Sequence, residues 1–428
     1  MIGWLGTFLI AASALAGLPL FIVILAAAMF GFILADVPLT VIAIELYRLI
    51  DTPMLLALPL FTFSGYVLAE SGLSLRLVRF TSRVMGWMPA GLAVVSFFVC
   101  AFFTAFTGAS GVTIVAVGAL LFPALLAGGY NERYSLGLVT TSGSLGLLLA
   151  PSLPLILYGV IAQQMDLPAS FSLRDLFLAG AIPALLMILS LSVYSVWVTK
   201  DLSLVREQFD GAEVLIQFQE LKWDIPLPFI VLGGIYSGLF AVSEAAAVTS
   251  AYVVLVYVFV KKEVNLSSVP RIVKESMMMV GGILLILGVS LAFTNYLIDA
   301  EVPQALFSWI NEFVKSKVAF LLLLNVVLLL LGAILDIFSA LVIMVPLILP
   351  LAISYGVDPV HLGIIFLANM QIGYFTPPIG MNLFIASYRF KKPISEVYLA
   401  TLPFMGVLLI VLALITYLPE ISLFFLDR

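Results

Sequence analysis

Apolar runs of about 17–25 residues recur from one end of this 428-residue chain to the other. Each run is long enough to cross the ~30 Å hydrocarbon core of a bilayer as a helix, which satisfies its own backbone hydrogen bonds there. Only 10% of the residues are charged, against about 25% in an average soluble domain. The sequence therefore predicts an all-α polytopic membrane protein.

The first of these runs, residues 1–20, contains Ala14-Leu15-Ala16, a pattern typical of a signal-peptidase site. No Lys or Arg precedes the run, so the positively charged region of a signal peptide is missing. We expect a retained membrane segment.

Two stretches of the chain look like copies of one design. Residues 142–159 read SGSLGLLLAPSLPLILYG and residues 368–385 read ANMQIGYFTPPIGMNLFI, with Pro151 and Pro377 in matching places. Pro123 and Pro350 lie at nearly the same offset. We therefore expect an internal repeat of residues 1–200 and 225–428, joined by a polar linker over 201–224.

Each half is expected to hold the same order of elements: two apolar segments, a third apolar segment, an amphipathic segment, an apolar hairpin, a broken helix and a closing helix. In the first half these lie at about 4–16, 18–35, 54–70, 73–86, 88–128, 134–165 and 173–198. In the second half they lie at about 226–243, 244–260, 277–297, 303–316, 318–355, 360–388 and 398–418.

The hairpins follow from the two longest apolar runs. Residues 88–128 and 318–355 are too long for one crossing and have no polar loop at their middle. Each run predicts a re-entrant hairpin, with its tip at FTGASG (106–111) or LDIFSA (335–340).

The distribution of positive charge predicts how the halves are oriented. If the first hairpin enters from the cytoplasm and an odd number of crossings inverts the second half, 14 of the 19 Lys and Arg residues are cytoplasmic. This asymmetry favours an inverted-topology repeat, which is typical of secondary transporters. Arg76, Arg79 and Arg83 share one helical face, which predicts an interfacial helix facing lipid headgroups.

The ion and substrate sites are expected where the helices are interrupted. Pro377 lacks a backbone donor and Gly373 permits unusual dihedrals, so carbonyl oxygens are freed inside the membrane. Such oxygen clusters bind hard monovalent cations, and half-helix N-termini face anions. We predict a first cation site at Thr107, Gly108, Ser110, Ser142, Gly143 and Gly146, and a second at Asp336, Ser339, Asn369, Gly373, Thr376 and Pro377. The residues expected to face substrate are Ser110, Ser152, Gly380 and Asn382.

Asp336 is the most specific single candidate for a functional residue, because placing a carboxylate within a membrane segment costs a free energy of at least about 2.5–3.5 kcal/mol. Its alternative is a helix cap or a pair with a nearby lysine, and the alternative for the Pro-Pro break is a kink that serves packing alone. Glu244 is predicted either to lie in the bilayer or to cap a helix.

These motifs resemble those of a known family. The stretches GLPL, FFTAFTGASGVT, GSLGLLLAPSLPLILYG, GIYSGLFAVSEAAA, LDIFSALVIMVPLILP and GYFTPPIGMNLF are similar to the large membrane subunit of tripartite ATP-independent periplasmic (TRAP) transporters, over nearly the whole chain. The chain departs from the family at Ala150, where a proline is frequent, and around Val242, where the family has Thr-Pro-Thr-Glu-Ala.

The resemblance implies a sodium-driven importer of organic acids, usually carboxylates, in the bacterial inner membrane. It implies Na+ as the coupling ion, no organic cofactor and an elevator mechanism, in which a mobile domain moves against a scaffold. It also implies two partners, a periplasmic substrate-binding protein and a small four-helix membrane subunit, which we expect to be a separate polypeptide because the large-subunit pattern starts at the beginning of this chain.

Other functions fit less well. A stand-alone cation-coupled carboxylate carrier would need no partner, and a passive channel would need no sodium gradient. A membrane-embedded enzyme needs paired aspartates or HExxH, and neither occurs. With one histidine and one cysteine, His361 and Cys100, we expect no transition metal, and no nucleic-acid partner is expected either.

Overall fold

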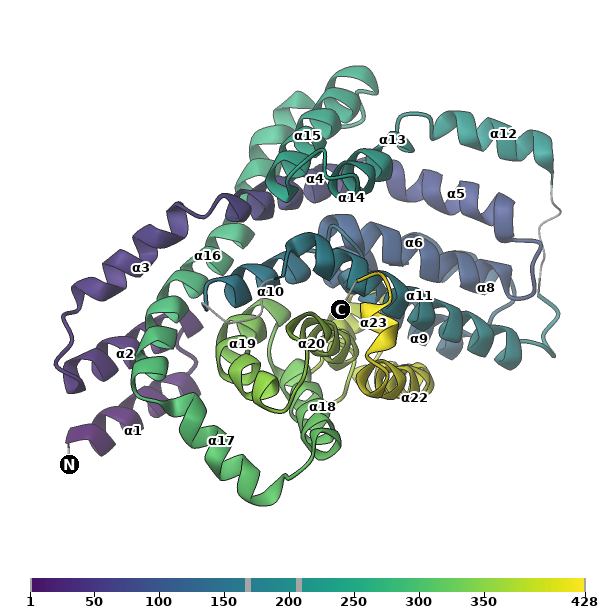
Figure 1. Ribbon diagram of the computed structural model, residues 1–428. Coiled ribbons are helices and arrows are strands. Elements are labelled where there is room, and N and C mark those ends of the chain that lie inside the picture. The colour runs from purple at the N-terminus through teal and green to yellow at the C-terminus, as the bar shows by residue number, and fades with distance from the viewer. Residues whose placement is uncertain (1, 166–170, 205–209, 427–428) are drawn as a thin grey trace.

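The computed structural model describes residues 2–165, 171–204 and 210–426, and every regular element within them is a helix (Figure 1). Eight helical stretches in this described part are long and apolar enough to cross a membrane. A ninth is added if α7 (Ser110–Ala116) and α8 (Gly118–Ala127), which meet at a bend of 48°, count together as one broken span or re-entrant segment. The prediction of an all-helical, multi-pass chain is confirmed.

The N-terminal elements are α1 (Ile2–Leu15), α2 (Leu20–Leu34), α3 (Thr40–Ile50), the 3-10 turn η1 (Pro53–Leu56), α4 (Ala57–Glu70) and α5 (Leu73–Met85). The first helices, α1 to α3, lie at one side of the molecule, and α4 and α5 lead from them toward the opposite side (Figure 1). The sequence prediction missed α3, which is amphipathic: it buries Ile42 and Leu49 and exposes Ile44 and Tyr47. Polar residues at Glu45 and Arg48 interrupt its apolar run, so it carries no span signal.

The first hairpin consists of α6 (Gly91–Thr107) followed by α7 and α8. Helix α6 ends because Gly108 has a φ of 65°, a left-handed conformation that glycine adopts at low cost. The broken helix expected over 134–165 is present as three separate elements, namely α9 (Glu132–Ser142), the 3-10 turn η2 (Leu145–Leu148) and α10 (Leu153–Gln163). The closing helix α11 (Leu173–Val198) has the predicted bounds.

The polar linker contains a helix that the sequence prediction missed, α12 (Gly211–Glu220). The elements after it are α13 (Pro226–Pro228), η3 (Phe229–Gly233), α14 (Gly234–Tyr236), α15 (Val242–Val254), η4 (Leu255–Val260), η5 (Leu266–Ser268), α16 (Val269–Asp299) and α17 (Val302–Phe313). Glu244 caps α15, because its Oε2 accepts a hydrogen bond from the Ala241 amide at 2.9 Å. The capping alternative for Glu244 is therefore the correct one.

The last part of the chain has two further interruptions. Its elements are α18 (Lys317–Ile334), α19 (Ile337–Ser354), α20 (Pro359–Gly373), α21 (Met381–Phe390), α22 (Ile394–Tyr417) and α23 (Glu420–Leu423). The first interruption, at 335–336, divides two helices of 18 residues, each about 27 Å long and thus close to crossing length by itself. The re-entrant path of this hairpin, like the inverted repeat, stays a prediction.

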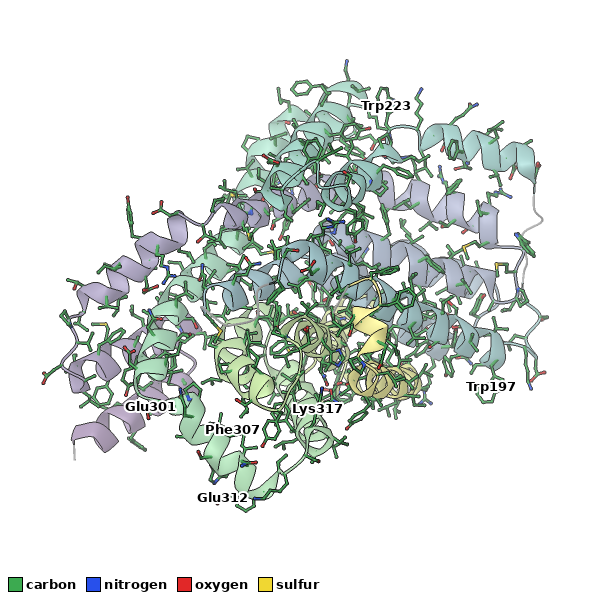
Figure 2. All side chains as sticks on the ribbon, in the orientation of Figure 1. Trp197, Trp223, Glu301, Phe307, Glu312 and Lys317 are labelled. Carbon is green, nitrogen blue, oxygen red and sulfur yellow. The ribbon has the colours of Figure 1, made fainter. Side chains whose placement is uncertain are left out.

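The interrupted helices form the centre of the molecule. All residues of α20 are buried, and 94% of the apolar window within Glu132–Gln163 is buried, against 44% for α22. Helix α16 packs on α2, α3 and α4 and also contacts α19, and Figure 1 shows it between the N-terminal helices and the bundle of α18 to α22. Trp197 and Trp223 lie at the periphery (Figure 2), as tryptophans at membrane–water interfaces do.

Candidate ion and substrate site

The first hairpin tip contacts the first helix break. The Thr104 hydroxyl donates to the Gly143 carbonyl at 2.8 Å and lies 2.6 Å from the Thr113 hydroxyl. A Cβ atom on Gly146 would lie 2.1 Å from the Ala101 carbonyl oxygen, so the break packs directly on α6. Predicted residues Gly143 and Gly146 are therefore within one compact unit with the tip.

The second tip contacts the second break in a similar way. The Tyr374 hydroxyl accepts a hydrogen bond from the Ile337 amide at 2.9 Å. A Cβ atom on Gly373 would lie 2.6 Å from Gly332 Cα, so the backbones of α18 and α20 are too close here to leave room for a side chain. Asp336 is the N-cap of α19, since its carboxylate accepts from the Ser339 amide at 3.0 Å and from the Ser339 hydroxyl at 2.5 Å.

Three further hydrogen bonds join these two units. The Ser110 hydroxyl, at the start of α7, donates to Asn382 Oδ1 on α21 at 2.8 Å, and Asn382 Nδ2 donates to the Thr140 carbonyl at 3.4 Å. The Ser144 hydroxyl in the first break donates to the Gln371 carbonyl at the end of α20, at 3.1 Å. Both tips and both breaks, far apart in the chain, are thus linked at the centre.

Four buried oxygen atoms in this region have no hydrogen-bond partner among the described residues: Thr107 Oγ1, Thr141 Oγ1, Asn369 Oδ1 and Gln371 Oε1. The four residues are at most 1% exposed. An unsatisfied buried oxygen costs about 1–3 kcal/mol, so such atoms in native proteins usually have an ion or a water as partner. Thr107 and Asn369 belong to the predicted cation sites, which fits neutral oxygen ligands for a monovalent cation.

Several predicted residues, with Asn369 among them, already donate side-chain hydrogen bonds to other groups of the protein. Asn369 Nδ2 donates to Asn325 Oδ1 at 2.6 Å and to the Ile365 carbonyl at 2.8 Å. The hydroxyls of Ser142, Ser152 and Thr376 donate to backbone carbonyls of their own segments. Gly380 is the N-cap residue of α21, and the half-buried Pro377 lies in the loop before it.

Sequence reasoning missed several residues of this region. They are Thr104, Thr113, Asn325, Gln371 and Tyr374. Asn325 and Gln371 carried a usable signal, since each is an amide within an apolar helix, and Gln371 lies two residues from Asn369. The threonines had a weaker one, and nothing in the sequence indicated Tyr374.

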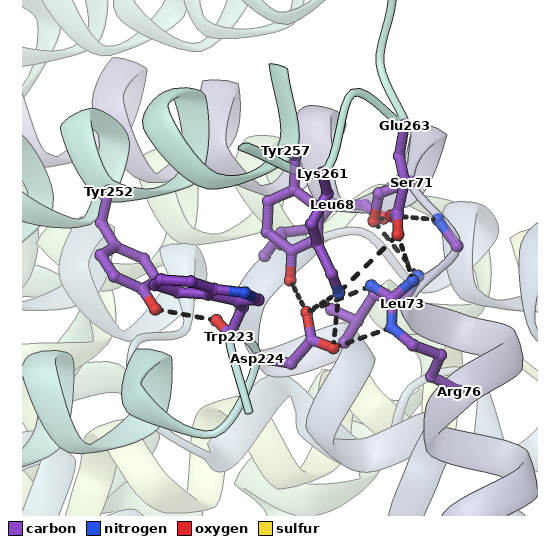
Figure 3. A network of polar contacts seen from close by, with 11 residues as sticks. Leu68, Ser71, Leu73, Arg76, Trp223, Asp224, Tyr252, Tyr257, Lys261 and Glu263 are labelled. Atoms are coloured by element: carbon purple, nitrogen blue, oxygen red, sulfur yellow. Dashed lines mark hydrogen bonds and ion pairs between the residues drawn. The ribbon is translucent and has the colours of Figure 1, made fainter. Parts of the chain in front are cut away.

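A second polar cluster lies away from the breaks, around Asp224 at the end of the linker (Figure 3). The Asp224 carboxylate, 3% exposed, accepts from Arg76 Nε at 2.8 Å, from Lys261 Nζ at 3.1 Å and from the Tyr257 hydroxyl. Glu263 accepts from Arg76 Nη1 at 2.5 Å and lies 3.7 Å from Lys261 Nζ. The negative charges of Asp224 and Glu263 thus balance the positive charges of Arg76 and Lys261.

The prediction that Arg76 faces lipid headgroups is wrong. Its guanidinium turns toward Asp224 and Glu263, because a carboxylate buried at the end of the linker needs a positive partner. Burial lowers the pKa of Arg76, but the hydrogen bonds and charges of Asp224 and Glu263 outweigh this, and the net pKa is raised above its ordinary value.

A buried, interrupted, polar centre inside an apolar helical bundle defines a class of protein, the membrane transporters. The model of the family described as "Tripartite ATP-independent periplasmic transporter, DctM component" matches residues 7–421. The chain therefore belongs to the DctM family of TRAP transporter large permeases, and it is not an enzyme.

Three curated relatives illustrate the family. The C4-dicarboxylate TRAP transporter large permease protein DctM of Pseudomonas aeruginosa is 34% identical, over 89% of this chain and 88% of its own. The isethionate TRAP transporter permease protein DctMQ of Oleidesulfovibrio alaskensis is 34% identical, over 91% of this chain and 61% of its own. The sialic acid TRAP transporter large permease protein SiaM of Vibrio cholerae is 30% identical, over 98% and 96%.

One solved structure has a similar fold. It is the YdaH transporter of Alcanivorax borkumensis, with a TM-score of 0.63 and 17% sequence identity, matched over 89% of this chain and 87% of that one. At this identity the likeness concerns the fold alone.

Proposed function

We propose that this chain is the large permease of a sodium-coupled importer of an organic acid, placed in a bacterial inner membrane. The observation that carries the proposal is the group of four orphaned, buried oxygen atoms near the hairpin tips and helix breaks, segments whose only carboxylate is that of Asp336. Neutral oxygens with few charges suit Na+, which is a hard cation. The curated relatives named for C4-dicarboxylates, isethionate and sialic acid support an organic anion as substrate.

Within this proposal, Na+ supplies the positive charge that the substrate anion needs. The tips and breaks at 106–111, 142–152, 335–340 and 369–382 contain no Lys or Arg. Helices α10 and α21 begin directly after the breaks, and the free amide groups at a helix N-terminus favour anions. The predicted substrate residues Ser110 and Asn382 form one hydrogen-bonded pair, at the junction of the two units.

The test is a pair of substitutions at Asp336. Asn caps a helix nearly as well as Asp, whereas Ala does not. In proteoliposomes with a sodium gradient, Asp336→Asn should keep the unfolding temperature but lose sodium-stimulated uptake, and Asp336→Ala should lose both. The matched control is Asp358→Asn, an N-cap of α20 outside the breaks, which should keep sodium stimulation. Unchanged sodium dependence in Asp336→Asn leaves Asp336 as a cap only.

We further propose that uptake needs a periplasmic binding protein and a small membrane subunit. The support is the family itself and the relative named DctMQ, of which this chain covers 61%. Uptake should appear only when all three proteins are reconstituted. Full-rate uptake by the chain alone favours the stand-alone carrier instead.

We also propose an elevator motion, in which residues 88–165 and 318–388 move as one body past a scaffold that includes 18–35 and 244–260. In a Cys100→Ser background, spin labels at Val115 and Val248, both exposed, report the distance between the bodies. That distance should change by many ångströms between sodium and sodium-free conditions, while the distance from Val115 to Phe384 within the mobile body stays fixed. One unchanged distribution for both pairs in active protein argues for a gate confined to the tips.

A further inference from the structure

A groove lies on the surface between α5, α8 and α12, and none of the residues that line it belongs to the breaks or to the Asp224 cluster. Its volume is about 580 Å³, which is within the usual range for a small-molecule site. The polar side chains that line it are Arg79, Ser82, Arg83 and Gln217, and the apolar ones are Val78, Leu92, Ala124 and Ala127.

Within the groove, Arg79 is the notable residue. It is exposed and makes no hydrogen bond or ion pair with any residue that the structure describes. Arg83, one helical turn further on, forms an ion pair with Glu213 of α12 at 2.7 Å. Residues four apart on a helix are neighbours, so both guanidinium groups line the same space.

Glu213 already offsets the charge of Arg83, whereas Arg79 has no acidic partner among the described residues, so the groove suits an anion bound at Arg79. Phosphate is a strong candidate, because arginine donates paired hydrogen bonds to its oxygens. The hydroxyl of Ser82 on α5 and the amide of Gln217 on α12 add two neutral donors to the lining of the groove.

The surroundings favour a lipid over a soluble anion. Besides the arginines, apolar side chains line the groove, and these suit a glycerol backbone and the first methylenes of an acyl chain. Beside it, α12 exposes Leu215, Ile216 and Phe218, and Trp87 is exposed just after α5. Exposed apolar side chains next to arginines are the pattern of a helix that lies in the membrane interface.

We propose that this groove binds an anionic phospholipid, with its phosphate on Arg79 and Arg83 and its glycerol on the apolar floor. A lipid bound there also contacts both α5 and α12, and so holds the linker helix against the first half of the chain. This site is independent of the transported substrate and of sodium.

The experiment uses the purified full chain in nanodiscs of phosphatidylcholine, with phosphatidylglycerol added as the probe. Retention of phosphatidylglycerol is measured by native mass spectrometry, and its effect on the unfolding temperature is measured in parallel. Arg79→Gln should weaken phosphatidylglycerol binding about tenfold or more, since a charge-assisted hydrogen bond is lost. Glu213→Gln should strengthen it several-fold, because the competing carboxylate is removed.

The matched control is Arg174→Gln, which removes an exposed arginine elsewhere and should leave phosphatidylglycerol binding unchanged. Equal loss in Arg174→Gln and Arg79→Gln overturns the site, because general surface charge then explains the binding. Equal stabilisation by inorganic phosphate and by phosphatidylglycerol overturns the lipid as occupant. A preference for phosphatidylglycerol that disappears only in Arg79→Gln supports the proposal.

Discussion

Around Asp224 every charged group has an opposite charge within 4 Å, whereas at the helix breaks four buried oxygen atoms have no partner in the described chain. Both clusters place polar atoms inside an apolar protein, where desolvation is costly. The Asp224 cluster offsets that cost permanently with its own arginine and lysine. At the breaks no described protein group offsets the desolvation cost of these oxygen atoms, so a ligand that binds and is released can offset it instead.

The first prediction breaks the charge balance. Asp224→Ala removes the more buried of the two acids that Arg76 and Lys261 share, and should lower the free energy of unfolding by about 3–5 kcal/mol. The loss is measured as a fall in the unfolding temperature of the purified protein. Glu220→Ala, which removes an exposed acid nearby, is the control and should have little effect. Equal unfolding temperatures for the two variants contradict a stabilising role for Asp224.

The second prediction concerns packing at the breaks. Gly373→Ala places a methyl group 2.6 Å from Gly332 Cα and should cost about 1–3 kcal/mol of stability, because two backbones must separate. Gly281→Ala in α16, where nothing lies within 4 Å of the added Cβ, should be neutral or stabilise by about 0.5–1 kcal/mol. The unfolding temperatures of both variants test the contrast, and a tolerated Gly373→Ala shows that α18 and α20 are free to move apart.

The third prediction uses an orphaned oxygen. Thr107→Val keeps the shape of the side chain but removes Oγ1, so it should raise the sodium-free stability by about 1 kcal/mol. It should also reduce the rise in unfolding temperature that sodium produces in the wild type. Thr62→Val removes a hydroxyl that donates to the Leu58 carbonyl at 2.6 Å, and should give no such gain. A loss of stability in Thr107→Val, equal to that of Thr62→Val, means that Thr107 has a partner in the protein.

The smallest expected effect is the coupling between the two units. Ser110→Ala and Asn382→Ala should be non-additive by about 0.5–1 kcal/mol in a double-mutant cycle, because they share one hydrogen bond. Ser110→Ala combined with Ser192→Ala should be additive, because the Ser192 hydroxyl donates to the Ile188 carbonyl of its own helix and shares no hydrogen bond with Ser110. Additive effects in the first cycle show that the hydrogen bond does not join the units energetically.

The hydrophobic periodicity alone was enough to predict most helices, and the Gly and Pro positions were enough to predict the breaks. The interruptions near 108, 143–152 and 374–380 follow from local chain chemistry, because glycine and proline act on the backbone next to them. Helix α11 begins at another local signal, the capping box of Ser172 and Asp175. Helices α3 and α12 were missed because their apolar and polar residues are mixed, and amphipathic segments give no span signal.

What only the tertiary structure decided is which polar groups meet. Sequence spacing could place Arg76, Arg79 and Arg83 on one face, but only the fold brings Asp224 to Arg76 and leaves Arg79 beside an open groove. Likewise, Ser110 and Asn382 are 272 positions apart, and no local rule relates them. Local backbone chemistry acts over a few residues and is therefore legible in the sequence, whereas charge pairing and hydrogen bonding depend on distances in space that long-range packing sets.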